Sequence, residues 1–125
     1  MTAGLPELDA VLSLERELLD DLAFALESQS ALQQSSLRER SLHRAAAEVF
    51  TASDRLRDAE LLRSVHTEQA AALLGLGPGP TLAELAARTG PPWREILLER
   101  RSQLRSAADD VAALSRPRTP GDRVD

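Results

Sequence analysis

Leucine recurs at steps of three and four residues through the first quarter of the chain, and this spacing constrains the fold more than any other feature. Because an α-helix turns once in about 3.6 residues, such steps gather apolar side chains on one stripe. The stripe predicts a long first helix that begins near Leu5, with Pro6 tolerated in its first turn. Its members are Leu5, Leu8, Val11, Leu12, Leu18, Leu19, Leu22, Leu26 and Leu32.

The apolar pattern stops around residues 33–36, where no Gly or Pro forces a break. Ser36-Leu37-Arg38-Glu39 fits a capping box, in which the Ser and Glu side chains satisfy each other's free amides. A second helix is therefore expected to begin there. The alternative is an exposed polar turn within one continuous helix.

A second apolar stripe follows and leads to Gly75, a natural C-terminal stop. A helix from about Leu37 to Leu74 would be on the order of 55 Å long, too long for an ordinary globule. We therefore expect an antiparallel hairpin with the first helix, in which small Ala residues allow close approach. The members of this second stripe are Leu42, Ala45, Val49, Ala52, Leu56, Ala59, Leu62, Val65 and Leu73.

The segment from Gly75 to Pro80 contains three Gly and two Pro, so no helix continues through it. Thr81-Leu82-Ala83-Glu84 forms a second capping box, which predicts a short helix that ends before Gly90 and Pro91-Pro92. Leu82, Leu85 and Ala86 of this helix are expected to pack against the end of the hairpin.

The last predicted helix carries the most regular repeat, with steps of four and three as in heptad a and d positions. Arg100 is the only charged residue at the positions of this stripe. These positions are Trp93, Leu97, Arg100, Leu104, Ala107, Val111 and Leu114. Residues 116–125 contain Pro and Gly and little to bury, so they are expected to form a disordered tail. Residues 1–115 are expected to form a single domain.

Two aromatic residues bear on what the helices contact. Trp93 is expected to anchor the last helix in the core beside Ile96 and Leu97. Phe24 turns to the opposite face from Leu22 and Leu26. It is expected either to fill a second seam against the last helix or to form part of a partner surface.

Charge and residue types argue against several classes of function. All fifteen basic residues are Arg, and twenty acidic residues leave a formal charge of −5, with the Arg residues interleaved among acids. Nucleic acid is therefore not expected as a partner. With no Cys, no catalytic nucleophile beside a base and no phosphate-binding motif, we expect no enzyme activity, cofactor or metal. No leader-like or membrane-spanning stretch occurs, which predicts a cytoplasmic protein without membrane insertion.

Several short runs occur in a fixed order along the chain. In the hairpin they are Leu14-Glu15-Arg16-Glu17-Leu18-Leu19, Phe24-Ala25-Leu26-Glu27 and Glu60-Leu61-Leu62-Arg63. Later runs are Leu74-Gly75-Leu76, Thr81-Leu82-Ala83-Glu84-Leu85-Ala86, and Pro92-Trp93 with Arg101 and Leu104. Over about Val11 to Leu114, these runs make the chain resemble the FlgN-type flagellar export chaperones, closest to the high-GC bacterial branch.

The resemblance implies an all-α helical bundle that keeps hook-filament junction proteins soluble and delivers them to the flagellar export gate. It also implies that a client helix is held along the stripe of the last helix, at Leu97, Leu104, Val111 and Leu114; Phe24 is the further candidate from its position. Pro117 and Pro120 shorten the end that family members extend. The alternative is a structural coiled-coil protein that forms a homodimer through the same stripe.

Overall fold

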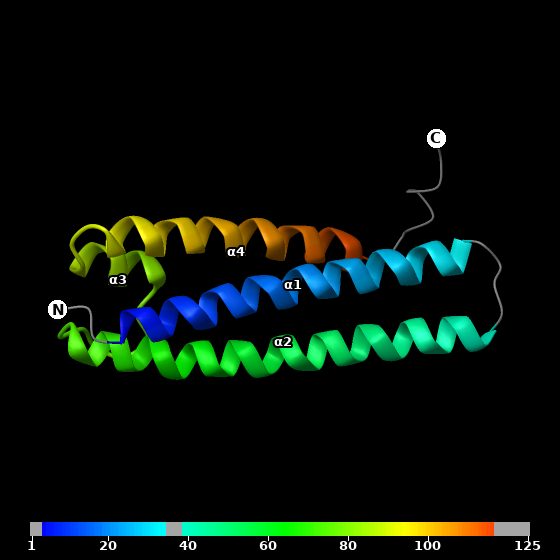
Figure 1. Cartoon of the computed structure of the whole chain (residues 1–125), viewed down its shortest axis with the longest axis horizontal. Coiled ribbons are helices and arrows are strands. Elements are labelled where there is room, and N and C mark those ends of the chain that lie inside the picture. The colour runs from blue at the N-terminus through cyan, green and yellow to red at the C-terminus, as the bar shows by residue number, and fades with distance from the viewer. Residues whose placement is uncertain (1–3, 35–38, 117–125) are drawn as a thin grey trace.

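The computed structural model of the chain describes residues 4–34 and 39–116, which form an all-α fold as predicted. Its helices are α1 (Leu5–Gln34), α2 (Glu39–Leu73), α3 (Leu82–Arg88) and α4 (Trp93–Ser115). α1 and α2 run antiparallel as a long hairpin, α4 lies along the other side of α1, and α3 sits near one end (Figure 1).

The hairpin excludes a single continuous helix through the first 73 residues, because α1 and α2 lie side by side (Figure 1). Ser36 of the first predicted capping box lies outside the described residues, as do residues 117–125 of the predicted tail.

The core lies along one stripe of α1, as the leucine spacing predicts. Leu8 and Leu12 have no exposed surface, and Leu19 and Leu22 are buried farther along the helix. Each fully buried Leu contributes about 1.5–3 kcal/mol by removal of apolar surface from water. The stripe of α1 is therefore the common surface on which the other helices pack.

α2 ends through hydrogen bonds that depend on Gly75. The Leu76 amide donates to the Ala71 carbonyl at 2.8 Å, and the Gly75 amide donates to the Ala72 carbonyl at 3.3 Å. This pair of bonds is the Schellman pattern, in which the residue directly after the helix adopts a left-handed conformation. Gly75 supplies it with a φ of 77°, which an L side chain rarely adopts.

α3 begins with the predicted capping box. The Glu84 amide donates to Thr81 Oγ1 at 3.1 Å, and the Thr81 amide donates to Glu84 Oε1 at 3.0 Å. Leu85 and Ala86 are buried in the core cluster with Leu5 and Leu8, so α3 covers the end of the hairpin as predicted.

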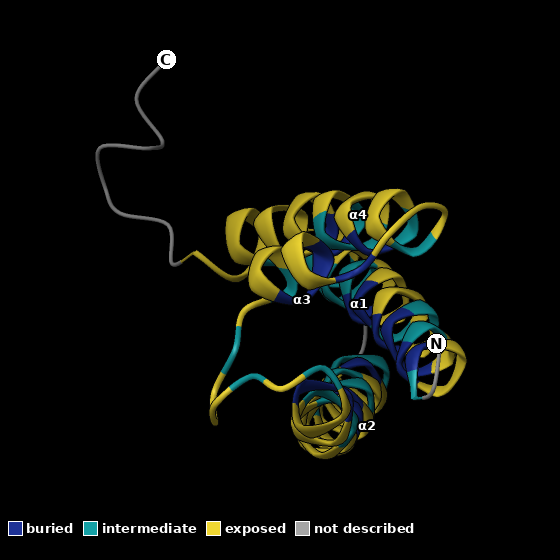
Figure 2. Ribbon diagram, turned by 90° about the vertical axis from the view of Figure 1, so that its left-hand side faces the viewer, coloured by how far each residue is buried: buried dark blue, intermediate teal, exposed yellow. Residues whose placement is uncertain are grey.

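α4 packs on α1 and on α3, and Trp93 is partly buried against the core as expected. Arg100, which interrupts its apolar stripe, donates from Nε to Asp9 Oδ1 at 2.7 Å and so joins α4 to α1. Within the described ranges, α2 and α4 each pack on α1 without their backbones meeting. Seen along the helix axes, α1 lies to one side of the line between α2 and α4, and the 74–81 segment runs along the other side (Figure 2).

Candidate partner-binding site

The proximal part of the α4 stripe is core rather than surface. Leu97 is 0% exposed and Leu104 is 7% exposed, and both belong to the cluster built on α1. The expectation that Leu104 is accessible to a client is therefore wrong for this arrangement, because α1 already covers it. A role in client binding at Leu97 or Leu104 remains a prediction that requires α4 to leave α1.

The other three predicted residues lie at the edge of the core or outside it. Val111 is partly buried against the core, and Leu114 is 37% exposed near the end of α4. Phe24 is 72% exposed and is not part of the core cluster, so it does not fill a second seam against α4. It lines a shallow pocket between α1 and α2, with Arg44 and Thr51 opposite. The five residues therefore do not form one continuous surface.

The C-terminal half of α2 exposes its largest apolar side chains. Leu62, Val65 and Leu73 were expected to continue the buried stripe of α2, and this prediction is wrong. They lie with Leu61 on the outer side of α2, where Leu73 borders Gly4 just before α1, and we call these four residues the outer row. Their exposed fractions are 64% for Leu61, 42% for Leu62, 52% for Val65 and 62% for Leu73.

Small residues occupy the inner face of the same half of α2. Ala59, Ala70 and Ala71 are buried there, and none is more than 3% exposed. Gly4, just before α1, comes so close that a Cβ built on it would lie 3.7 Å from Ala70 Cα of this face and 3.3 Å from Leu73 Cδ1 at its edge. Larger side chains on this face would force the helices apart. The close approach therefore favours Ala on the inner face.

A charged pair stands in the middle of the hairpin interface. Glu15 is 5% exposed and occupies the position of the α1 stripe between Leu12 and Leu19. Arg63 of α2 lies opposite, with Nε 2.9 Å from Glu15 Oε1. This contact is an ion pair whose geometry is not that of a directed hydrogen bond, since Oε1 has no hydrogen-bond partner among the described residues.

Burial governs the charge state of Glu15. Removal from water raises the pKa of the Glu15 carboxyl above its ordinary value of 4.5, Arg63 opposes the rise, and Glu60 adds to it. The sequence contained a signal for this pair, because the leucine stripe of α1 has a gap at Glu15. Sequence reasoning missed it by counting only the apolar positions.

Neither a metal-binding cluster nor a membrane-spanning helix is found among the described residues. Between residues 4–34 and 39–116, no three His, Asp or Glu side chains are grouped to hold a metal ion. None of the four helices is long and apolar enough to cross a membrane. Comparison of the chain with protein-family models, curated proteins and solved structures found no match.

Proposed function

We propose that this protein is a helix-binding chaperone that holds an amphipathic helix of a partner protein on the outer row of α2. The observation that carries the proposal is the inverted arrangement of α2, with Ala inside and Leu and Val outside. An exposed group of large apolar side chains costs solubility, and such groups on soluble proteins commonly mark interaction sites.

The geometry of the outer row favours a helix as its occupant. Leu61 and Val65 are one turn apart, and Leu62 and Leu73 are three turns apart, so the row follows the axis of α2. A partner helix with apolar residues at i, i+3, i+4 and i+7 presents a complementary stripe along its own axis. Apart from Leu73, which borders Gly4, the row is also uncovered within the described structure, whereas the stripe of α4 is covered by α1.

The partner class comes from the sequence resemblance. The proposed clients are hook-filament junction proteins in the cytoplasm, whose assembly-prone helices would be masked until delivery to the flagellar export gate. Masking requires no bond chemistry. It requires only that the free energy gained by burying apolar surface between the bound helix and this protein exceed the cost of the entropy lost on association.

A second candidate uses the same surface. The outer row would also suit a second copy of this chain, which would make the protein a self-associating helical protein without a dedicated client. The molecular mass in solution separates the two candidates, because a dimer held by the outer row dissociates when a charge is placed there.

The proposed function is tested by co-expression with hook-filament junction proteins from the same genome, followed by pull-down. Leu62→Asp places a charge in the outer row, and Leu98→Asp is its matched control on α4, since both leucines are 42% exposed. We expect Leu62→Asp to abolish capture and Leu98→Asp to retain it. Equal capture by wild type and Leu62→Asp, or no capture by wild type, would reject the proposal.

A further inference from the structure

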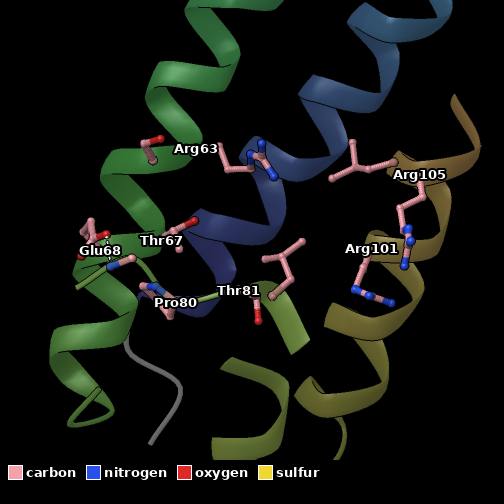
Figure 3. Close-up of a pocket in the computed structure, with 11 residues that line it drawn as sticks. Arg63, Thr67, Glu68, Pro80, Thr81, Arg101 and Arg105 are labelled. Atoms are coloured by element: carbon pink, nitrogen blue, oxygen red, sulfur yellow. Dashed lines mark hydrogen bonds between the residues drawn. The ribbon is translucent and has the colours of Figure 1, made fainter. Parts of the chain in front are cut away.

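A second concave site lies between α2 and α4, at the end closed by α3. It is a pocket of about 460 Å³, within the range of sites that take one or two side chains or a small ligand. Arg63, Thr67 and Glu68 project from α2 on one side, and Arg101 and Arg105 project from α4 on the other (Figure 3). Pro80 and Thr81 lie at the closed end, and Leu82 and Leu104 add apolar surface to the lining.

Two of the charged groups in this pocket are already engaged. Arg63 is paired with the buried Glu15 of α1. Glu68 is engaged through Oε1, which accepts a hydrogen bond of 2.7 Å from the Gly79 amide and so ties the 74–81 segment to α2. Both interactions are part of the fold. The charge of Arg63 is paired with Glu15, whereas the Gly79 amide positions Glu68 without supplying a counter-charge.

Arg101 and Arg105 have no such engagement. Neither guanidinium group makes a hydrogen bond or an ion pair with any residue of the described ranges. They lie one turn apart on α4, about 6 Å between Cβ atoms, where two like charges disfavour the helix. A pair of free guanidinium groups at the mouth of a pocket is thus a positive site on a chain whose net charge is −5.

We propose that this arginine pocket binds a carboxylate-bearing segment of a protein partner, with an Asp or Glu side chain between Arg101 and Arg105 and a neighbouring apolar side chain against Leu82. Guanidinium groups bind carboxylates through short charge-assisted hydrogen bonds, often two at a time. The apolar lining selects a peptide over a free anion. The overall negative charge of the protein repels an extended polyanion such as nucleic acid, while a single acidic side chain fits inside.

The arginine pocket and the outer row use different residues of α2, although they meet at one edge. Thr67 of the pocket is turned by about 140° from Leu62, whereas Glu68 lies two turns after Leu61 on nearly the same line. The inference therefore does not rest on the proposed function. Removal of the two arginines leaves the outer row intact, and a charge at Leu62 leaves the pocket intact.

The test measures binding of a short fluorescein-labelled peptide rich in Glu and Leu by fluorescence anisotropy at low salt. Its matched peptide carries Gln in place of every Glu. The variant Arg101→Gln/Arg105→Gln removes the two free charges of the pocket, and Arg57→Gln/Arg94→Gln removes two exposed charges elsewhere. The net charge changes equally in both.

We expect the wild-type protein to bind the Glu peptide and to bind the Gln peptide much more weakly. Affinity for the Glu peptide should fall about tenfold or more in Arg101→Gln/Arg105→Gln and stay within about twofold in the control variant. Equal binding of both peptides, equal loss in both variants or no binding by wild type would overturn the inference. Displacement of the peptide by an equal concentration of inorganic phosphate would also overturn it, because the pocket would then be a site for free phosphate.

Discussion

In the C-terminal half of α2, the inner face carries small apolar side chains and the outer face carries large ones, which is the reverse of most amphipathic helices. The inner face presents Ala59, Ala70 and Ala71 with one paired Arg, and the outer face presents Leu and Val. If hairpin stability alone had determined the residues, the larger apolar side chains would be buried, since each contributes more than Ala on leaving water. Our proposal accounts for the difference by an interaction of the outer residues outside the hairpin.

The largest effect is expected on the inner face. Ala70→Asp places an unpaired charge and extra volume where Gly4 and Ala70 approach closely, and it should lower the free energy of unfolding by about 4 kcal/mol. Urea unfolding followed by circular dichroism measures the change. If Ala70→Asp unfolds at the wild-type urea concentration, the inner face is not packed and the comparison fails.

The ion pair should respond unequally to loss of its two partners. Arg63→Met leaves the buried Glu15 without a counter-charge, at a cost of roughly 3 kcal/mol near neutral pH. The folded-state pKa of Glu15 is raised, so charging it destabilises the fold increasingly as pH rises from its ordinary value of 4.5 through the raised pKa. Arg63→Met raises that pKa further. The gap to wild type should therefore open as the pH rises through the raised pKa of wild-type Glu15 and widen until the still higher pKa in the variant is passed.

The matched variant of this pair is Glu15→Gln. Arg63 keeps a side chain that is 36% exposed and so remains solvated when its partner is neutral. We expect Glu15→Gln to retain most of the stability and to flatten its dependence on pH. Urea unfolding curves recorded near pH 4.5 and near neutrality give the free energy of unfolding of both variants and of wild type at each pH. A constant difference between Arg63→Met and wild type over this range would show that Glu15 is not the group responsible.

The smallest effect on stability is expected on the outer face. Leu62→Asp loses only helix propensity at an exposed position, about 0.5 kcal/mol. Leu98→Asp on α4 should lose a similar amount. A much larger loss for Leu62→Asp in the same urea experiment would mean that the outer row packs against this chain, and it would remove the reason to assign it to a partner.

The helices themselves could be predicted from the sequence because their signals are local. The leucine spacing of α1, the Gly75 stop and the Thr81–Glu84 capping box each act within a few residues, and each is present in the structure. The position of Trp93 against the core followed in the same way from the start of the α4 stripe.

The faces of α2 could not be predicted in this way. After Ala59, one helical pattern continues through Leu62 and Val65, and another continues through Arg63 and Ala70. Hydrophobicity favours the first pattern, but the close approach of Gly4 to Ala70 and the carboxylate of Glu15 favour the second. Both causes lie in a distant part of the sequence, at the start of α1 and within it. For the same reason, the burial of Leu104 under α1 and the convergence of Arg63 with Arg101 could not be inferred from the spacing within one helix.

Thiol labelling tests the central claim most directly, because the chain contains no Cys and a single introduced thiol reports one position. Val65→Cys probes the outer row, Ala70→Cys the inner face, and Leu98→Cys serves as the exposed control on α4. In the free protein, we predict rapid labelling of Val65→Cys and Leu98→Cys and slow labelling of Ala70→Cys. Addition of a captured junction protein should protect Val65→Cys and leave Leu98→Cys unchanged. Slow labelling of Val65→Cys in the free protein, or unchanged labelling with the partner bound, would contradict the assignment of the outer row as the partner-binding site.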